Sequence, residues 1–140
     1  MSPLQNCIKN KDTTKKPIWI MRQAGRYLPE FREIRKKNPD FIKLCLNSNL
    51  SSEITLQPLK RFDFDAAIIF SDILMIPLGL GQSVNFKKSF GPELGEMDFK
   101  KLKNITTNEF VEKLSPVYET IKKTASSNLL KQKDLFGFVG

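Results

Sequence analysis

The sequence of 140 residues contains no histidine. This absence excludes a histidine-centred catalytic triad and a histidine-ligated metal site within the chain. The two cysteines, Cys7 and Cys45, match no metal-binding or redox spacing, so we expect both to be reduced thiols. No apolar run approaches the roughly 18 residues of a membrane helix, and the first residues form no hydrophobic signal segment. These features predict a cytoplasmic protein with no membrane association.

Acidic residues are fewer than basic ones, 15 against 23, which gives a formal net charge of +8. Such a surplus favours anionic partners, either nucleic acid or a small polycarboxylate. The lysines are spread along the chain, so we interpret most of them as solvated surface. The sequence also lacks the aromatic-studded basic strand and the recognition-helix pattern of nucleic-acid-binding modules. We therefore expect no nucleic-acid partner, and keep a basic nucleic-acid-binding module as an alternative.

A short apolar run, Ile18–Met21, ends in two arginines, Arg22 and Arg26. The run has the length and composition of a strand, Gly25 permits a turn, and the proline at position 29 suits the first turn of a helix. This pattern predicts a strand, a tight loop and a helix. Each guanidinium on the loop can bind a carboxylate or phosphate through two hydrogen bonds, which indicates an anion site. The alternative is a surface loop with two solvated arginines.

Helical and hairpin patterns account for most of the remaining chain. The expected helices combine apolar residues at helical spacing with capping residues or a proline near the first turn. A proline deeper in a helix predicts a kink or a break. The first expected elements are a helix over residues 1–9, a helix from Pro29, a helix capped by Asn38, and a helix from Asn49 or Ser51 with a kink at Pro58. An apolar loop or short helix over residues 73–81 and a hairpin over residues 84–92 are expected next. The last expected helix is opened by the Thr106–Glu109 capping box and interrupted at Ser115-Pro116, and its apolar stripe consists of Phe110, Leu114, Val117 and Ile121.

Two further segments, Ala66–Phe70 and Asp134–Gly140, are predicted to be strands. The first is apolar throughout, which is typical of a parallel strand covered on both faces. Strands separated by helices return in the same direction, so their carboxyl ends meet at one edge. We therefore expect Asp72, which follows the first of these segments, to lie near Arg22 and Arg26.

Asp72 has two structural interpretations besides a catalytic one. Aspartate is a preferred N-cap residue, and an apolar segment follows Asp72 directly. Asp72 can also form an ion pair with Arg22 or Arg26 that serves only the fold. The sequence leaves these alternatives open.

The fold class predicted from this order is α/β, the N-terminal part of a (β/α)8 TIM barrel with about three parallel strands. Such a barrel typically requires about 250 residues and eight strands, so 140 residues cannot close one. The last predicted strand would present an open apolar edge, which favours aggregation. We therefore interpret residues 1–140 as an N-terminal fragment of a single barrel domain.

Three stretches of the sequence resemble the uroporphyrinogen decarboxylase family. The longest, Pro17–Glu30, is similar to the family's N-terminal signature, and Glu53–Phe62 and Asp65–Leu74 are similar to later family motifs. The last four residues, Gly137–Gly140, resemble the beginning of a second signature. The resemblance runs from about Ile18 to Gly140.

The resemblance implies a (β/α)8 barrel with a deep cleft at the carboxyl end of its strands, assembled as a homodimer. It also implies a reaction that removes carbon dioxide from the acetate side chains of uroporphyrinogen to give coproporphyrinogen. This reaction would use neither a metal nor an organic cofactor. The expected partner is thus a polycarboxylate tetrapyrrole, as one of the two charge-based alternatives suggests.

Particular residues take roles from the same resemblance. Arg22 and Arg26 would bind substrate carboxylates, and Asp72 would accept hydrogen bonds from the pyrrole N–H groups. Arg22 and Asp72 are the candidate catalytic residues. The remaining candidates for substrate binding are Gln23, Ala24 and Gly25 along the loop and Arg35 on the following helix.

The family's tyrosine, serine or threonine, and histidine site residues would belong to later strands. The resemblance therefore implies that the 140 residues are inactive by themselves. Two alternatives remain: a fragment that functions only with a separate C-terminal half, and a methyltransferase relative with the same barrel, whose zinc ligands also belong to later strands.

Overall fold

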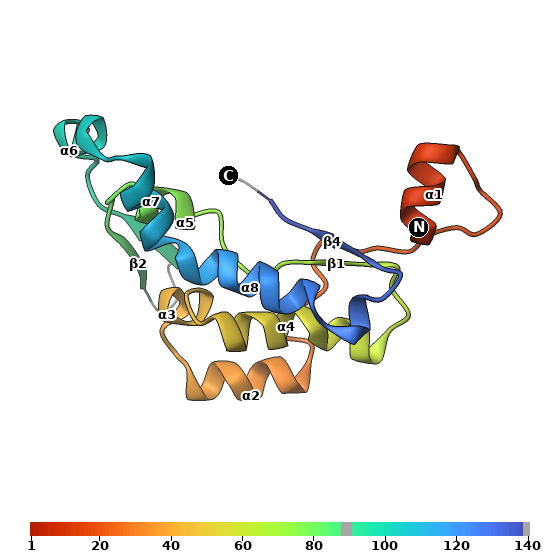
Figure 1. The fold of residues 1–140 in the computed structure, drawn as a ribbon. Helices are drawn as coiled ribbons and strands as arrows, with labels where there is room; N and C mark the ends of the chain where they lie inside the picture. The colour runs from red at the N-terminus through yellow and green to blue at the C-terminus, as the bar shows by residue number, and fades with distance from the viewer. Residues whose placement is uncertain (88–90, 139–140) are drawn as a thin grey trace.

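The computed structural model describes residues 1–87 and 91–138 (Figure 1). A short sheet of β1 and β4 lies over α4 and α8, and α2 lies on the opposite side of α4 from the sheet. Residues 88–90 of the expected hairpin, and Val139 and Gly140 of the expected last strand, lie outside the described residues. The elements are α1 (Pro3–Asn10), α2 (Pro29–Lys37), α3 (Phe41–Cys45), α4 (Ser48–Arg61), β1 (Ala66–Ile68), α5 (Met75–Gly79), β2 (Val84–Lys87), β3 (Gly91–Leu94), α6 (Phe99–Asn104), α7 (Thr107–Lys113), α8 (Ser115–Ala125), η1 (Asn128–Leu130) and β4 (Asp134–Phe136).

The β1–β4 sheet is parallel, which confirms the α/β class. Ala66 lies opposite Asp134, and Ile68 lies opposite Phe136. One further hydrogen bond extends the pairing, since Ile69 N donates to Phe136 O at 2.9 Å. Both strands are shorter than the apolar runs that predicted them.

The predicted first strand, Ile18–Met21, is wrong for this structure. Ile18 O accepts a hydrogen bond from Asp65 N at 2.8 Å, which is the kind of contact a strand would make. The neighbouring Ile18 N, however, donates to the carboxylate of Asp65, also at 2.8 Å. The chain then turns at residues 21 and 22. In a strand ladder, a backbone carbonyl would accept the hydrogen bond from Ile18 N. Here the Asp65 side chain accepts it, so the ladder does not continue.

The helix patterns are confirmed in most places, but two of the expected caps are wrong. Asn47, rather than Asn49 or Ser51, caps α4, because its side chain accepts from Leu50 N at 3.1 Å. Asp40, rather than Asn38, caps α3, because its side chain accepts from Lys43 N at 3.0 Å. Asn38 instead donates to Ile34 O at 2.9 Å and closes the end of α2. α4 extends through Pro58, and the hairpin of β2 and β3 is antiparallel as expected.

The α7–α8 region confirms the capping box, the break and most of the predicted apolar stripe, since Leu114 is buried with Phe110 and Val117 packed against its cluster. The buried face of α8 differs from the prediction at Ile121. Thr106 and Glu109 form both bonds of the capping box. Thr120 and Thr124 are fully buried, whereas Ile121 is 37% exposed. The helix restarts at Ser115, so the periodicity counted from the preceding helix does not carry through α8. Thr124 Oγ1 donates to Ser52 Oγ on α4 at 3.0 Å.

The core consists of three apolar clusters arranged around α4 and the ends of β1. α4 contributes to two of them, which explains why it lies between the sheet and α2. The buried members are Leu28, Phe31, Leu44 and Ile54 in the first cluster, Leu59, Phe64, Ala67 and Leu130 in the second, and Cys45, Met75 and Leu114 in the third.

The amino end of the sheet is covered by side chains from the start of the chain. Asp134, the first residue of β4, accepts hydrogen bonds from Ser2 Oγ and Gln5 Nε2. Ser2 is 4% exposed and also caps α1. Lys15 Nζ lies 3.5 Å from the Asp65 carboxylate just before β1. Figure 1 shows α1 at this end of the molecule, away from the β2–β3 hairpin.

Gly79 provides a test of the packing between α5 and α7. An added Cβ would lie 2.7 Å from a ring carbon of Phe110 and 3.0 Å from a methyl carbon of Leu114. Overpacking of this kind costs about 1–3 kcal/mol. We expect Gly79→Ala to lower the urea unfolding midpoint, and Gly137→Ala, whose Cβ would meet nothing within 4 Å, to leave it nearly unchanged. Equal midpoints for the two variants would contradict this packing.

Candidate anion-binding site

The loop between the turn at residue 21 and α2 carries the two predicted anion-binding arginines. Arg22 and Arg26 are both exposed. Among the described residues, neither guanidinium makes a hydrogen bond or an ion pair. Their charges are therefore available to an external carboxylate or phosphate.

The backbone of this loop is held from several directions. Gln23 is 2% exposed, and its Nε2 donates to Ala66 O of β1 at 2.8 Å. The hydroxyl of Tyr27 donates to Gln23 O. Arg32 Nη1, from α2, donates to Arg26 O at 2.7 Å and to Tyr27 O at 3.1 Å. The loop thus presents exposed charged side chains from a constrained backbone.

Ala24 and Gly25 complete the loop, and Gly25 does not have the conformation expected for it. Its φ lies outside the left-handed region, where the described glycines are Gly81 and Gly91. A Cβ at position 25 would meet only the Tyr27 ring, at 3.8 Å. The turn here therefore does not require glycine, and the expectation from the sequence is wrong on this point.

Asp72 follows the carboxyl end of β1 and is half-buried. Its Oδ1 accepts from Leu74 N at 2.9 Å, and its carbonyl accepts from Met75 N at 3.1 Å. Asp72 therefore organises the turn before α5, but the N-cap of α5 is Leu74, without a side-chain cap bond, so the prediction of Asp72 as a helix N-cap is wrong. Within the described part of the chain, Asp72 makes no ion pair with Arg22 or Arg26, and its Oδ2 makes no hydrogen bond. One carboxylate oxygen thus remains able to accept from a ligand.

Arg35 is engaged in the connection between α2 and α3. Its Nη1 donates to Asn38 O at 2.7 Å and to Pro39 O at 3.3 Å. Its guanidinium carbon lies 5.4 Å from the centre of the Phe41 ring. These contacts give Arg35 a structural role that the sequence did not reveal.

Asp72 and Arg35 are brought into the same neighbourhood around Cys45. Burial, with a smaller contribution from the charge of Asp72, raises the pKa of the Cys45 thiol to about 12, and the charge of Arg35 opposes the rise. Phe41 bridges this region to the end of β1, since its ring centre lies 6.0 Å from that of Phe70. The structure therefore groups Asp72 with Arg35, while the Arg22–Arg26 loop is connected to β1 through Gln23.

An ion pair beside the loop was not anticipated from the sequence. Arg61 at the end of α4 binds both carboxylate oxygens of Glu30, at 2.6 and 2.9 Å. The hydrogen bonds from Arg61 lower the pKa of Glu30 to about 2. Glu30 lies in the first motif that carries the family resemblance, and Arg61 lies in the second. Their places in these two motifs are the one sign in the sequence that could have suggested the pair.

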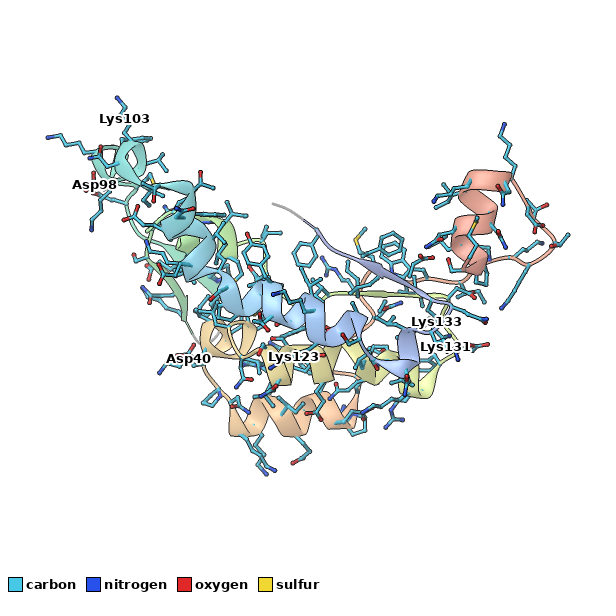
Figure 2. All side chains as sticks on the ribbon, in the orientation of Figure 1. Asp40, Asp98, Lys103, Lys123, Lys131 and Lys133 are labelled. Carbon is cyan, nitrogen blue, oxygen red and sulfur yellow. The ribbon has the colours of Figure 1, made fainter. Side chains whose placement is uncertain are left out.

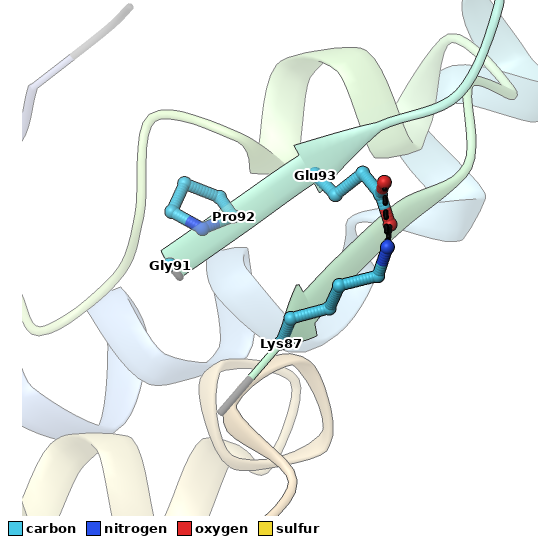
Figure 3. Close-up of a pocket in the computed structure, with 4 residues that line it drawn as sticks. All are labelled: Lys87, Gly91, Pro92 and Glu93. Atoms are coloured by element: carbon cyan, nitrogen blue, oxygen red, sulfur yellow. Dashed lines mark hydrogen bonds and ion pairs between the residues drawn. The ribbon is translucent and has the colours of Figure 1, made fainter. Parts of the chain in front are cut away.

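The surface hollows lie away from these residues. Figure 3 shows one beside the hairpin, lined by Lys87, Gly91, Pro92 and Glu93. Lys87 Nζ lies 2.7 Å from Glu93 Oε2, so the lysine charge is already paired. None of the predicted site residues lines this hollow. Because it contains no uncompensated charge, we do not assign the anion site to it.

The basic surface is dispersed, as the sequence suggested. Figure 2 shows the labelled Lys103 and Lys123 apart from each other and from Lys131 and Lys133, which lie close together. Lys123 connects α8 to the start of α4 through Ser48 and Asn49. Over the described residues, no three cysteine, aspartate or glutamate side chains come close enough to hold a metal ion. None of the helices described is long and apolar enough to span a membrane.

The fold and the site define an α/β protein with a candidate anion-binding loop connected to a parallel strand, and with a carboxylate after the end of that strand. The chain belongs to the uroporphyrinogen decarboxylase family, whose sequence profile matches residues 1–140.

Curated relatives named uroporphyrinogen decarboxylase are similar to nearly all of the chain. The relative from Agrobacterium fabrum is 46% identical over 95% of this chain and 38% of its own length. The relative from Chelativorans sp. is 48% identical over 89% of this chain and 36% of its own length. The relative from Rickettsia felis is 46% identical over 100% of this chain and 40% of its own length. The chain thus spans less than half the length of these relatives.

The Glu30–Arg61 pair predicts a specific dependence of stability on pH. The pKa of Glu30 is lower in the folded chain than its ordinary value of 4.5, so ionised Glu30 stabilises the fold. This stabilisation is complete above about pH 4.5 and is lost as the pH falls towards 2. We expect Glu30→Gln to lower the urea midpoint at neutral pH and to match the unsubstituted chain near pH 2. Glu33→Gln, on the same helix, is the control; an identical pH profile for the two variants would exclude the pair as the cause.

Cys45 predicts a difference in thiol reactivity. The thiolate is the reactive form, and a pKa of about 12 together with 1% exposure makes it scarce and inaccessible in Cys45. We expect iodoacetamide at mildly alkaline pH to alkylate the half-buried Cys7 and to reach Cys45 only after denaturation. Peptide mass spectrometry distinguishes the two sites, and equal native labelling rates would show that Cys45 is not shielded.

Proposed function

We propose that this chain supplies part of the active site of a uroporphyrinogen decarboxylase, which removes carbon dioxide from the acetate side chains of uroporphyrinogen to give coproporphyrinogen. The observation that carries the proposal is the pair of exposed guanidiniums of Arg22 and Arg26, which have no hydrogen-bond or ion-pair partner within residues 1–87 and 91–138, on a backbone that is itself held in place. Family membership supports the choice of a tetrapyrrole over other polyanions.

The proposed architecture is the N-terminal part of a (β/α)8 barrel. The parallel pairing of β1 with β4 and the helices between them support it. A barrel of about 250 residues exceeds this chain, which spans 36% to 40% of the lengths of its relatives. A homodimeric state and a cytoplasmic location are further parts of the proposal that rest on the resemblance and the composition.

The proposed chemistry begins with a proton added to a pyrrole carbon, which makes the ring a cationic electron sink. The bond between the acetate methylene and its carboxylate then breaks, and its electron pair delocalises into the ring as carbon dioxide leaves. Protonation of the methylene carbon gives the methyl group, and loss of the proton first added to the pyrrole carbon restores the aromatic ring of the product. By family resemblance, we propose that the reaction uses no metal or organic cofactor.

Asp72 is the residue proposed to stabilise the cationic ring. A fixed carboxylate acts most strongly on developing charge where water is excluded. The turn hydrogen bond to Leu74 N holds one oxygen of Asp72, and Oδ2 is proposed to accept from the pyrrole N–H groups.

The arginines are proposed to hold the carboxylates. Arg26 and Arg22 would each form a two-pronged contact, with Gln23, Ala24 and Gly25 contributing along the loop backbone. We rank orientation of the leaving carboxylate above proton donation for Arg22, because a guanidinium is a very weak acid. Arg35 is a further candidate, and would have to leave its contacts with Asn38 and Pro39 to reach a ligand.

The proposal is tested by joining residues 1–140 to the remaining part of the Rickettsia felis relative and assaying coproporphyrinogen formation. We expect Arg22→Lys to lower kcat about 10- to 100-fold, since a charge-assisted hydrogen bond contributes roughly 1.5–3 kcal/mol. Lys36→Arg, which exchanges an exposed cation on α2, should leave kcat unchanged. Unaltered kcat in Arg22→Lys would argue against both roles of Arg22. The 140-residue chain alone should show no turnover, and clear turnover would refute its assignment as an incomplete site.

A further inference from the structure

Gln23 is the buried polar residue of the loop that carries Arg22 and Arg26, and its amide nitrogen is engaged with the neighbouring strand. It is 2% exposed, and its Nε2 donates to Ala66 O at 2.8 Å. Its own carbonyl accepts from the hydroxyl of Tyr27. Gln23 therefore connects the loop to β1 through its side chain and to the start of α2 through its backbone.

This connection lies where the backbone pairing ends. The preceding segment touches β1 through Ile18 and Asp65, and the chain then turns at residues 21 and 22. Beyond that turn, the side-chain amide of Gln23 links the loop to the strand by donating a hydrogen bond to Ala66 O. β1 leads directly towards Asp72, so this bond relates the arginines to the carboxylate.

Because Arg22 and Arg26 are sequence neighbours of held residues, the bond from Gln23 to Ala66 O also restricts where their backbone lies. Arg22 directly precedes Gln23, and Arg26 directly precedes Tyr27. Each arginine is thus next to a residue whose position is held. Arg32 Nη1 adds a second anchor by donating to Arg26 O at 2.7 Å.

We propose that Gln23 is a positioning residue, with Arg32 as a second anchor, which sets the place of Arg22 and Arg26 relative to Asp72. Gln23 acts through its amide bond to Ala66 O and does not touch the substrate with its side chain. This assignment rests on the proposed function, and it deepens that function by identifying the contact that fixes the loop of Arg22 and Arg26 against β1.

The chemistry of the amide makes the proposal testable with a near-isosteric substitution. Gln23→Glu keeps the size of the side chain but replaces the donor with a carboxylate oxygen facing Ala66 O. A matched control exists, because Gln82 Nε2 donates to Gly95 O at 2.7 Å in the hairpin region. Gln82→Glu breaks the same kind of bond away from the arginine loop.

The first measurement is amide hydrogen exchange across Arg22–Tyr27 in the 140-residue chain. We expect Gln23→Glu to accelerate exchange of this segment about tenfold relative to the unsubstituted chain. Gln82→Glu should leave it within about twofold. Unchanged exchange in Gln23→Glu would overturn the anchoring.

The second measurement is binding of uroporphyrin, the oxidised form of the proposed substrate ring, to the protein in which residues 1–140 are joined to the remaining part of the Rickettsia felis relative. Uroporphyrin fluorescence follows the binding. We expect Gln23→Glu to weaken binding at least fivefold and Gln82→Glu to leave it unchanged. Equal binding by the two variants would overturn the positioning role. Failure of the joined protein without either substitution to bind would instead overturn the proposed function, and the exchange rates would still decide whether Gln23 anchors the loop.

A variant at an exposed position covers the case in which Gln23→Glu does not fold. Arg32→Met removes the second anchor without disturbing a buried group. It should accelerate exchange around Arg26 and weaken uroporphyrin binding, whereas Lys36→Met, which removes a neighbouring charge, should do neither. The same response in both variants would attribute the effect to net charge and overturn the role of Arg32.

Discussion

The parallel pairing of β1 with β4 is the constraint on which the rest of the structure depends. Two parallel strands need a long connection to return the chain in the same direction. Here the connection runs from α5 to η1 and covers one face of the sheet with α8, beside α4. Because the pairing is parallel, the carboxyl ends of both strands lie together, and Asp72 follows one of them. The candidate site is therefore a consequence of strand direction.

Side chains, more than backbone ladders, attach the arginine loop to this sheet. Asp65 replaces a carbonyl as the acceptor for Ile18 N, and the Gln23 amide takes over beyond the turn. Such attachments hold the backbone while leaving the charged ends of Arg22 and Arg26 exposed. Anion-binding loops benefit from this combination, because less order has to be gained when a ligand binds.

Local patterns predicted much of the fold. The capping box at Thr106–Glu109, the apolar run at Ala66–Phe70 and the hairpin each depend on chemistry within a few residues, and each is confirmed. The order of these elements was enough to predict parallel strands, since helical connections allow little else. The family motifs supplied the candidate site residues, and their proposed roles remain predictions.

The errors arose where tertiary contacts decided between local alternatives. Ile18–Met21 has strand composition, but the competing carboxylate of Asp65 lies 47 residues away in the sequence. The burial of Thr124 depends on its contact with Ser52 on α4, which no periodicity within α8 could indicate. The amide of Gln23 similarly finds its acceptor in a distant strand. Contacts of this kind require the fold to be known before they can be recognised.

The hydrogen bonds that Ser2 and Gln5 donate to Asp134 make the two ends of the sheet different. They occupy the amino end of the sheet, together with the contact of Lys15 with Asp65. Polar side chains thus cover the amino end of β1 and β4, and the proposed carboxylate-rich ligand would have to reach these strands from their carboxyl end.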